Sequence, residues 1–140
     1  MSIERTLVLV KPDGVQRGLT GEILRRIEAK GYRLIALQQR TATEEELRAH
    51  YAEHDGKSFF PSMLAFMSSG PVVAAVLEGE RVIAGFRSLA GATDPTVAAP
   101  GTIRGDLGRD WGTVEMRNLV HGSDAPESAA REIKIWFPGL

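Results

Sequence analysis

The stretch Thr6-Leu7-Val8-Leu9-Val10 is a continuous apolar run near the start of the chain. Strands that are buried on both faces have such uninterrupted runs, whereas half-buried strands alternate between apolar and polar residues. The run is short for a helix, and Pro12-Asp13-Gly14 then indicates a turn. We therefore expect a central strand over residues 6–10.

Outward from this strand, the pattern predicts further strands over residues 32–37, 72–77 and 117–120. Thr20 can cap a helix that ends at Gly31, and Thr43 with three following acidic residues indicates another helix start. Further helices are expected over residues 60–67 and 82–89. A last helix is expected after Asp124, with Glu127 completing a capping box and one apolar face formed by Ala129, Ile133, Trp136 and Phe137.

This order of elements predicts an α+β fold of the ferredoxin-like βαββαβ type, in one domain over residues 1–140. We expect a four-stranded antiparallel sheet that helices cover on one face. Residues 91–112 are rich in Gly, Pro, Asp and Thr and predict one long loop before the last strand. A loop of that length in a compact domain is usually functional or part of an interface.

The composition of the 140-residue chain excludes several classes of function. The chain has no cysteine, which excludes disulfides, thiolate metal sites and a cysteine nucleophile. Its net charge of −1 argues against strong nucleic-acid binding and against a membrane surface. No apolar run has transmembrane length, and the first residues lack the apolar core of a signal peptide. We therefore expect a cytoplasmic protein.

His121 lies between the last predicted strand and the last predicted helix, within Asn118-Leu119-Val120-His121-Gly122-Ser123-Asp124. An arbitrary histidine at a strand end is more often a structural polar residue than a nucleophile. Here Gly122 removes bulk beside the ring, and Ser123 and Glu132 can hydrogen-bond it. A carboxylate or hydroxyl that holds one ring nitrogen fixes the tautomer and leaves the other nitrogen free to attack.

The other two histidines, His50 and His54, flank Tyr51 on a charged segment. Their four-residue spacing is compatible with a metal site on a helix, but no HExxH pattern accompanies it. An exposed, solvated helix face is the favoured interpretation.

Three cations are candidates for binding an anion. Lys11 follows the first strand directly, Arg87 interrupts an apolar helix, and Arg104 lies in the glycine-containing segment Pro100-Gly101-Thr102-Ile103-Arg104-Gly105-Asp106. A cation of this kind is, by itself, more often an ordinary surface charge, although for Lys11 the two interpretations are about equal; with His121 the three suggest a phosphate site. The chain has no P-loop and no GxGxxG pattern. Side chains and a metal ion must therefore hold any nucleotide phosphates.

Phe59-Phe60-Pro61 places two adjacent aromatic residues before a proline. Packing is favoured for them, with one ring inward and one against the loop, and the alternative is a ring exposed for stacking on a base.

These segments, in this order, closely resemble the nucleoside diphosphate kinase family over nearly the whole chain. The segments that carry the resemblance are Glu4-Arg5-Thr6, Lys11 to Gly18, Phe59-Phe60-Pro61, Ser69-Gly70-Pro71-Val72, Pro100 to Asp106 and Asn118 to Asp124. The resemblance implies ping-pong transfer of the γ-phosphate of a nucleoside triphosphate, typically ATP, to a nucleoside diphosphate through phosphorylated Nδ1 of His121, which balances nucleotide pools. It also implies Mg²⁺ bound mainly through the nucleotide phosphates, without metal ligands from the protein.

The resemblance further implies a role for each matching residue. Lys11, Arg87 and Arg104 would take up the γ-phosphoryl charge, with Arg87 and Thr93 at the phosphates and Lys11 and Asn118 near the sugar hydroxyls. Phe59 would stack on the base, Tyr51 would lie near His121, and Ser123 and Glu132 would orient the imidazole. The alternatives are a regulatory or nucleic-acid-binding protein of this fold with secondary kinase activity, and a phosphohistidine carrier between proteins.

One departure from the family pattern lies just before the candidate nucleophile. The segment from Leu107 to Arg117 is longer by a few residues than that pattern, and it contains Trp111. Trp111 either packs against another chain or covers its own loop. The family implies a homo-oligomer, a tetramer or hexamer built from dimers, and the sequence does not decide between these.

Overall fold

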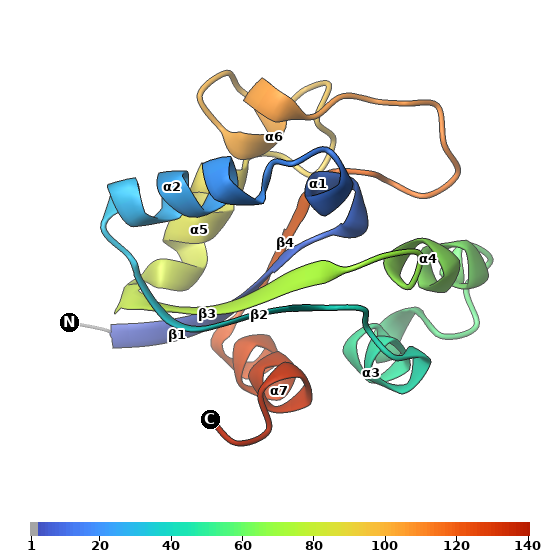
Figure 1. Cartoon of the computed structure of the whole chain (residues 1–140), viewed down its shortest axis with the longest axis horizontal. Helices are drawn as coiled ribbons and strands as arrows, with labels where there is room; N and C mark the ends of the chain where they lie inside the picture. The colour runs from blue at the N-terminus through green and yellow to red at the C-terminus, as the bar shows by residue number, and fades with distance from the viewer. Residues whose placement is uncertain (1–2) are drawn as a thin grey trace.

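The computed structural model describes residues 3–140 and has a four-stranded antiparallel sheet with the strand order β2-β3-β1-β4 (Figure 1). The strands are β1 (Ile3–Val10), β2 (Arg33–Arg40), β3 (Val72–Glu80) and β4 (Val120–Gly122). Strand β1 pairs with β3 along its whole length and with β4 at its end, where Leu9 lies opposite His121. The predicted central strand and the ferredoxin-like α+β fold are therefore confirmed.

Helices cover both faces of this sheet, so the prediction of one covered face is wrong (Figure 1). The helices over one face are α1 (Pro12–Gln16), α2 (Thr20–Lys30), α5 (Val82–Ala90) and α6 (Ile103–Leu107), and those over the other face are α3 (Glu44–His50), α4 (Phe60–Met67) and α7 (Pro126–Trp136). The single turn η1 (Ala52–His54) follows α3. Apolar side chains on both sides of β1 require both layers: Leu7 packs in the cluster with Trp136, whereas Val8 packs in the cluster with Phe86.

Some predicted helix ends are confirmed and others shift. Gly31 ends α2 in the left-handed conformation, with φ +102°. Thr43 caps α3 through its Oγ1, which accepts a 3.1 Å hydrogen bond from the Glu46 N–H. Thr20 does not cap α2: it is the first helical residue, and Leu19 occupies the cap position.

The start of α7 also differs from the prediction. Ala125 is its N-cap residue, so Asp124 lies one position before the cap and Glu127 completes no capping box with it. Instead, Ser128 Oγ accepts a 3.0 Å hydrogen bond from the Ala125 N–H and donates to the carboxylate of Asp124. The extended backbone of Ala125 moves the start of the helix to Pro126.

Two loop predictions need correction. The predicted loop over residues 91–112 contains α6, because Thr102 caps a short helix by accepting a 2.9 Å hydrogen bond from the Gly105 N–H. The last strand begins at Val120 and not at residue 117, because Leu119 has a φ of +74° and interrupts the extended backbone. Likewise, the predicted turn at Pro12 is the start of α1.

Within residues 3–140, no helix has the length and apolar character that a membrane span requires.

The core on the α2 face yields a test of the packing. Ile27 is fully buried, whereas Ile3 is 64% exposed. We expect Ile27→Ala to lower the free energy of unfolding by about 2–5 kcal/mol, because it removes buried methyl groups and leaves a cavity. The matched change Ile3→Ala is expected to stay within about 0.5 kcal/mol. Urea unfolding followed by circular dichroism measures both, and equal effects would contradict the packing.

Candidate functional site

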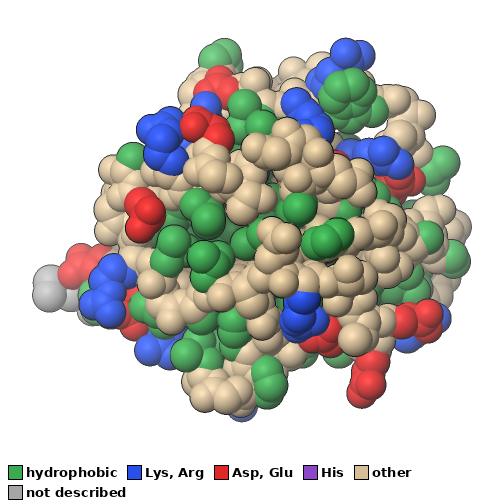
Figure 2. Space-filling model, in the orientation of Figure 1, with side chains coloured by type: hydrophobic (Ala, Val, Ile, Leu, Met, Phe, Trp, Pro, Cys, Tyr) green, Lys and Arg blue, Asp and Glu red, His purple; other side chains and the backbone are tan. Residues whose placement is uncertain are grey.

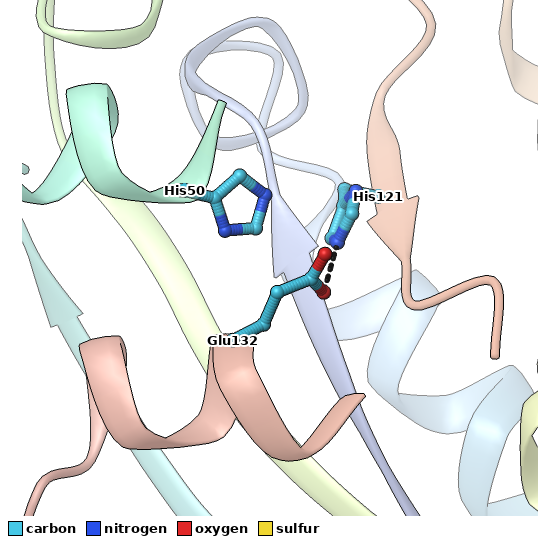
Figure 3. Close-up of side chains that lie close together, drawn as sticks. All are labelled: His50, His121 and Glu132. Carbon is cyan, nitrogen blue, oxygen red and sulfur yellow. Dashed lines mark hydrogen bonds and ion pairs between the residues drawn. The ribbon is translucent and has the colours of Figure 1, made fainter. Parts of the chain in front are cut away.

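The imidazole of His121 is held by a carboxylate from the last helix. His121 lies on β4, and its Nε2 is 2.8 Å from Oε1 of Glu132 on α7 (Figure 3). Ser123 Oγ donates a 2.7 Å hydrogen bond to the same Oε1 and accepts one of 3.2 Å from the Leu7 N–H. An ionised carboxylate only accepts hydrogen bonds, so the proton of neutral His121 lies on Nε2 and the lone pair on Nδ1.

Ser123 and Glu132 were both expected to orient the imidazole of His121, and they do so in different ways. Glu132 contacts the ring directly, whereas Ser123 acts through Glu132. Gly122 allows close packing, because a Cβ at this position would lie 2.6 Å from the ring of Phe86. Asp124 hydrogen-bonds to Ser128 at the start of α7.

His50 is a residue of this site that the sequence interpretation missed. It is 3% exposed, not solvated as predicted, and its ring is edge-on to that of His121 with the centroids 4.6 Å apart (Figure 3). Its Nδ1 accepts a 3.0 Å hydrogen bond from Trp136 Nε1. Burial, together with the positive charge that His121 and Arg131 can place nearby, holds the pKa of His50 well below its ordinary value. The available sequence signal was the apolar residue Leu47, three positions earlier, because residues three apart share one face of a helix. Leu47 is buried, and His50 faces inward with it.

Ligand atoms of His50, His121 and Glu132 lie within 4.8 Å of one another, which is close enough for a metal ion. The hydrogen bond from Trp136 argues against that role. Because the indole N–H occupies Nδ1 of His50, neutral His50 carries its proton on Nε2 and has no second lone pair for a metal. The group is better described as a hydrogen-bonded His121–Glu132 pair beside a neutral histidine. His54 is half-buried, with its ring against that of Phe59, and it lines a second cavity together with His50 and His121.

On its other side, His121 borders a cavity of about 310 Å³. Seven of the predicted site residues line it: Lys11, Tyr51, Arg87, Thr93, Arg104, Asn118 and His121. They come from the residue between β1 and α1, the α3–η1 junction, α5, the following loop, α6, and β4 with the residues before it. Segments that are far apart in the sequence therefore contribute to one polar cavity beside a histidine.

Hydrogen bonds fix the floor of this cavity. Lys11 Nζ donates to Asn118 Oδ1 at 2.8 Å, and Asn118 Nδ2 donates to the Thr93 carbonyl at 3.0 Å. Burial and the charge of Arg104 lower the pKa of Lys11 to about 8. Burial and the charge of Arg87 lower the pKa of Arg104 to about 10. Burial is the larger cause of both shifts and the neighbouring cation adds to it, while the carboxylate of Asp13 acts in the opposite direction.

Arg104 also has a structural role that its sequence position did not indicate. Its guanidinium donates to the carbonyl oxygens of Asn118, Gly91 and Val120, at 3.1, 3.0 and 2.6 Å. Three of its five N–H groups therefore hold backbone around the cavity.

The adjacent aromatics Phe59 and Phe60 separate in the structure. Phe60 packs in the core at 4% exposure, whereas Phe59 is 41% exposed at the start of α4. One ring thus packs inward, as the favoured interpretation expects, while the ring of Phe59 lies against His54 and Lys57 and not in the core. Its ring is available at the surface, outside the lining of the cavity beside His121.

The segment from Leu107 to Arg117 contacts an earlier part of the chain through Trp111. The guanidinium groups of Arg17 and Arg109 lie over its ring, 5.6 and 4.4 Å from the centroid. The side chain is still 48% exposed. A contact of Trp111 with another chain stays a prediction.

A histidine whose Nε2 contacts a carboxylate, beside a cavity lined by a lysine and two arginines, has the groups that phosphoryl transfer requires. On this fold and site the protein is a histidine-dependent phosphotransferase by class. Comparison with known proteins is more specific, since the family model described as nucleoside diphosphate kinase matches residues 4–140. The chain belongs to the nucleoside diphosphate kinase family, and its activity is the transfer of a γ-phosphate from a nucleoside triphosphate to a nucleoside diphosphate.

Individual relatives agree along the full chain. Nucleoside diphosphate kinase from Mycolicibacterium gilvum is 65% identical over 138 residues, covering 98% of each chain. A structure of the halophilic enzyme from Halobacterium salinarum in complex with CDP has a TM-score of 0.90 at 48% identity, covering 97% of this chain and 88% of that one. The enzyme from Borrelia burgdorferi, solved as a transition-state mimic with vanadate and ADP, has a TM-score of 0.91 at 36% identity, covering 96% and 87%.

The lowered pKa of His50 makes a prediction about stability. Its ordinary value is 6.5, so below that pH the unfolded chain binds a proton that the folded protein does not. The free energy of unfolding therefore carries no penalty from His50 above pH 6.5. Below that pH it decreases as the pH falls, by up to about 1.4 kcal/mol per pH unit. His50→Gln is expected to remove this part of the slope. Urea unfolding from pH 7 to pH 5 measures it, and parallel curves for the two proteins would contradict the assignment.

Proposed function

We propose that Nδ1 of His121 accepts the γ-phosphoryl group and then returns it to a second nucleoside diphosphate. The single observation that supports this best is the 2.8 Å contact between His121 Nε2 and Glu132. With the proton held on Nε2, the lone pair of Nδ1 attacks the γ-phosphorus. The bond from that phosphorus to the β–γ bridging oxygen breaks, and the nucleoside diphosphate leaves with the electron pair. The second half-reaction reverses these steps with the second nucleoside diphosphate. The complete exchange balances the pools of nucleoside di- and triphosphates.

The cavity residues supply the charge and donors for this step. Lys11, Arg87 and Arg104 neutralise the charge that the transferring group spreads over its oxygens. Thr93 meets the phosphates beside Arg87, while the linked Lys11 and Asn118 meet the sugar hydroxyls. Burial raises the pKa of Tyr51, so its hydroxyl stays protonated and can donate a hydrogen bond beside His121.

The base is assigned to the exposed ring of Phe59. Stacking uses the π-face that every base has, so it accepts purines and pyrimidines without hydrogen bonds to their edges. The relatives in complex with CDP and with ADP are consistent with such tolerance. The exposure of Phe59 supports this role over packing in the core.

Mg²⁺ fits this site as a companion of the nucleotide. The residues that line the cavity include three cations and no carboxylate, and carbonyl and carboxylate oxygens are what Mg²⁺ prefers from proteins. We infer that phosphate oxygens and water hold the ion, which when bound neutralises phosphate charge.

The assembly proposed is a homo-oligomer, a tetramer or hexamer built from dimers. Strand β2 is an outer edge of the sheet, and its Leu37 is 51% exposed. Figure 2 shows hydrophobic side chains gathered in the centre of this view, with charged side chains around them. An apolar surface with an unpaired strand edge favours association. A single domain over residues 1–140 and a cytoplasmic location stay predictions of the same proposal.

A labelling experiment tests the proposed chemistry. We expect the protein, mixed with γ-labelled ATP and Mg²⁺, to carry acid-labile label that moves to GTP when GDP is added. His121→Ala should carry none, whereas Ile3→Ala, at the exposed start of β1, should keep it. Glu132→Gln should slow labelling about 10²-fold or more, because the amide can donate to Nε2 and so place the ring proton on Nδ1.

Two results would refute the proposal. Label that GDP does not remove would rule out the relay between nucleotides. Full labelling of the His121→Ala variant would place the phosphoryl group on another residue.

A further inference from the structure

The backbone just before His121 contains a tight, strained turn. Leu119 has a φ of +74°, and the Val120 N–H donates a 2.8 Å hydrogen bond to the Asn118 carbonyl. This is a γ-turn with a positive φ at its centre, which is a rare and strained conformation for a branched side chain. Such a conformation persists only where the surroundings hold it.

The main contact that holds the turn is the carboxylate of Asp13. Its Oδ2 accepts a 3.1 Å hydrogen bond from the Leu119 N–H, and the Lys11 N–H donates at 2.8 Å to the Leu119 carbonyl. Asp13 is 8% exposed, on α1, directly after the central strand. The side chain of Leu119 is fully buried, so packing in the core also holds the turn in place.

The position of the turn explains its importance. Asn118, on one side, hydrogen-bonds to Lys11 and to the backbone of Thr93 at the floor of the cavity. His121 lies two residues after Leu119 on the other side. An extended residue at position 119 would send these two side chains in different directions, whereas the turn places both in the lining of one cavity.

We propose that Asp13 is a positioning residue for phosphoryl transfer, because its hydrogen bond to Leu119 holds the turn that aims Asn118 and His121 into the same cavity. Asp13 is absent from the cavity lining, so this effect passes through the backbone. The proposal rests on His121 being the phosphorylated residue.

Asp13 also acts through its charge, and two variants separate the effects. Its carboxylate lies close enough to Lys11 and Arg104 to stabilise their positive charges. Asp13→Asn removes the charge and keeps a carbonyl oxygen that can accept from Leu119. Asp13→Ala removes both. Ile27→Val, on α2 in the apolar core that also contains Leu119, is a control for general loss of stability that leaves the Asp13 hydrogen bond in place.

The experiment is rapid-quench labelling of His121 by Mg²⁺ and γ-labelled ATP over a range of concentrations. Asp13→Ala should lower the maximal labelling rate about tenfold or more and change the apparent Kd of ATP less than about threefold, because misplaced reacting groups slow the chemical step more than binding. Asp13→Asn should recover most of the rate, and Ile27→Val should match the parent.

Amide hydrogen exchange tests the turn independently of activity. The Leu119 amide should be protected in the parent and in Asp13→Asn, and unprotected in Asp13→Ala. Fast exchange of this amide in the parent would overturn the proposal even if the alanine variant does not fold. Equal loss of rate in both variants would also overturn it, because the charge would then be the cause. Label on another residue of the parent would instead refute the role of His121, with the exchange data still reporting on the turn.

Discussion

The buried carboxylate of Glu132 is the interaction on which the site and the packing around it depend. It is 5% exposed, and an ionised carboxylate at that depth is costly unless hydrogen bonds satisfy it. His121 and Ser123 both donate to its Oε1, and Ser123 also accepts from the backbone of Leu7. The same network therefore joins α7, β4 and the central strand β1. The hydrogen bonds that fix the tautomer of His121, the proposed nucleophile, therefore also hold the last helix against the sheet.

The opposite charges lie on opposite sides of His121. Glu132 lies behind the ring, whereas Lys11 and Arg104 lie at the cavity in front of it. Lowered pKa values of both cations show the free energy cost of crowding them in a partly buried place. Such cations need no rearrangement when a phosphoryl group arrives, which is how preorganised sites lower a barrier. The strained backbone at Leu119 is a second cost of the same arrangement.

Local patterns in the sequence predicted much of this structure. The apolar run over residues 6–10 defines the central strand, and Gly31 ends a helix where a positive φ is needed. The sequence predicted helices of both layers but placed them on one face, because an apolar run shows burial without showing what covers it. The start of β4 and the burial of His50 depend on contacts with Asp13 and Trp136, which are far away in the sequence. The family resemblance supplied the set of cavity residues, whereas spacing alone could not show that they converge.

The central claim is that Glu132 reserves Nε2 of His121 and leaves Nδ1 to react. The most direct test is to identify which ring nitrogen carries the phosphoryl group. The protein, labelled with ¹⁵N in its histidine rings and phosphorylated by Mg²⁺ and ATP, can be examined by correlated ³¹P and ¹⁵N NMR. The account predicts a phosphorus–nitrogen coupling to Nδ1 of His121. A coupling to Nε2 of this residue would contradict it.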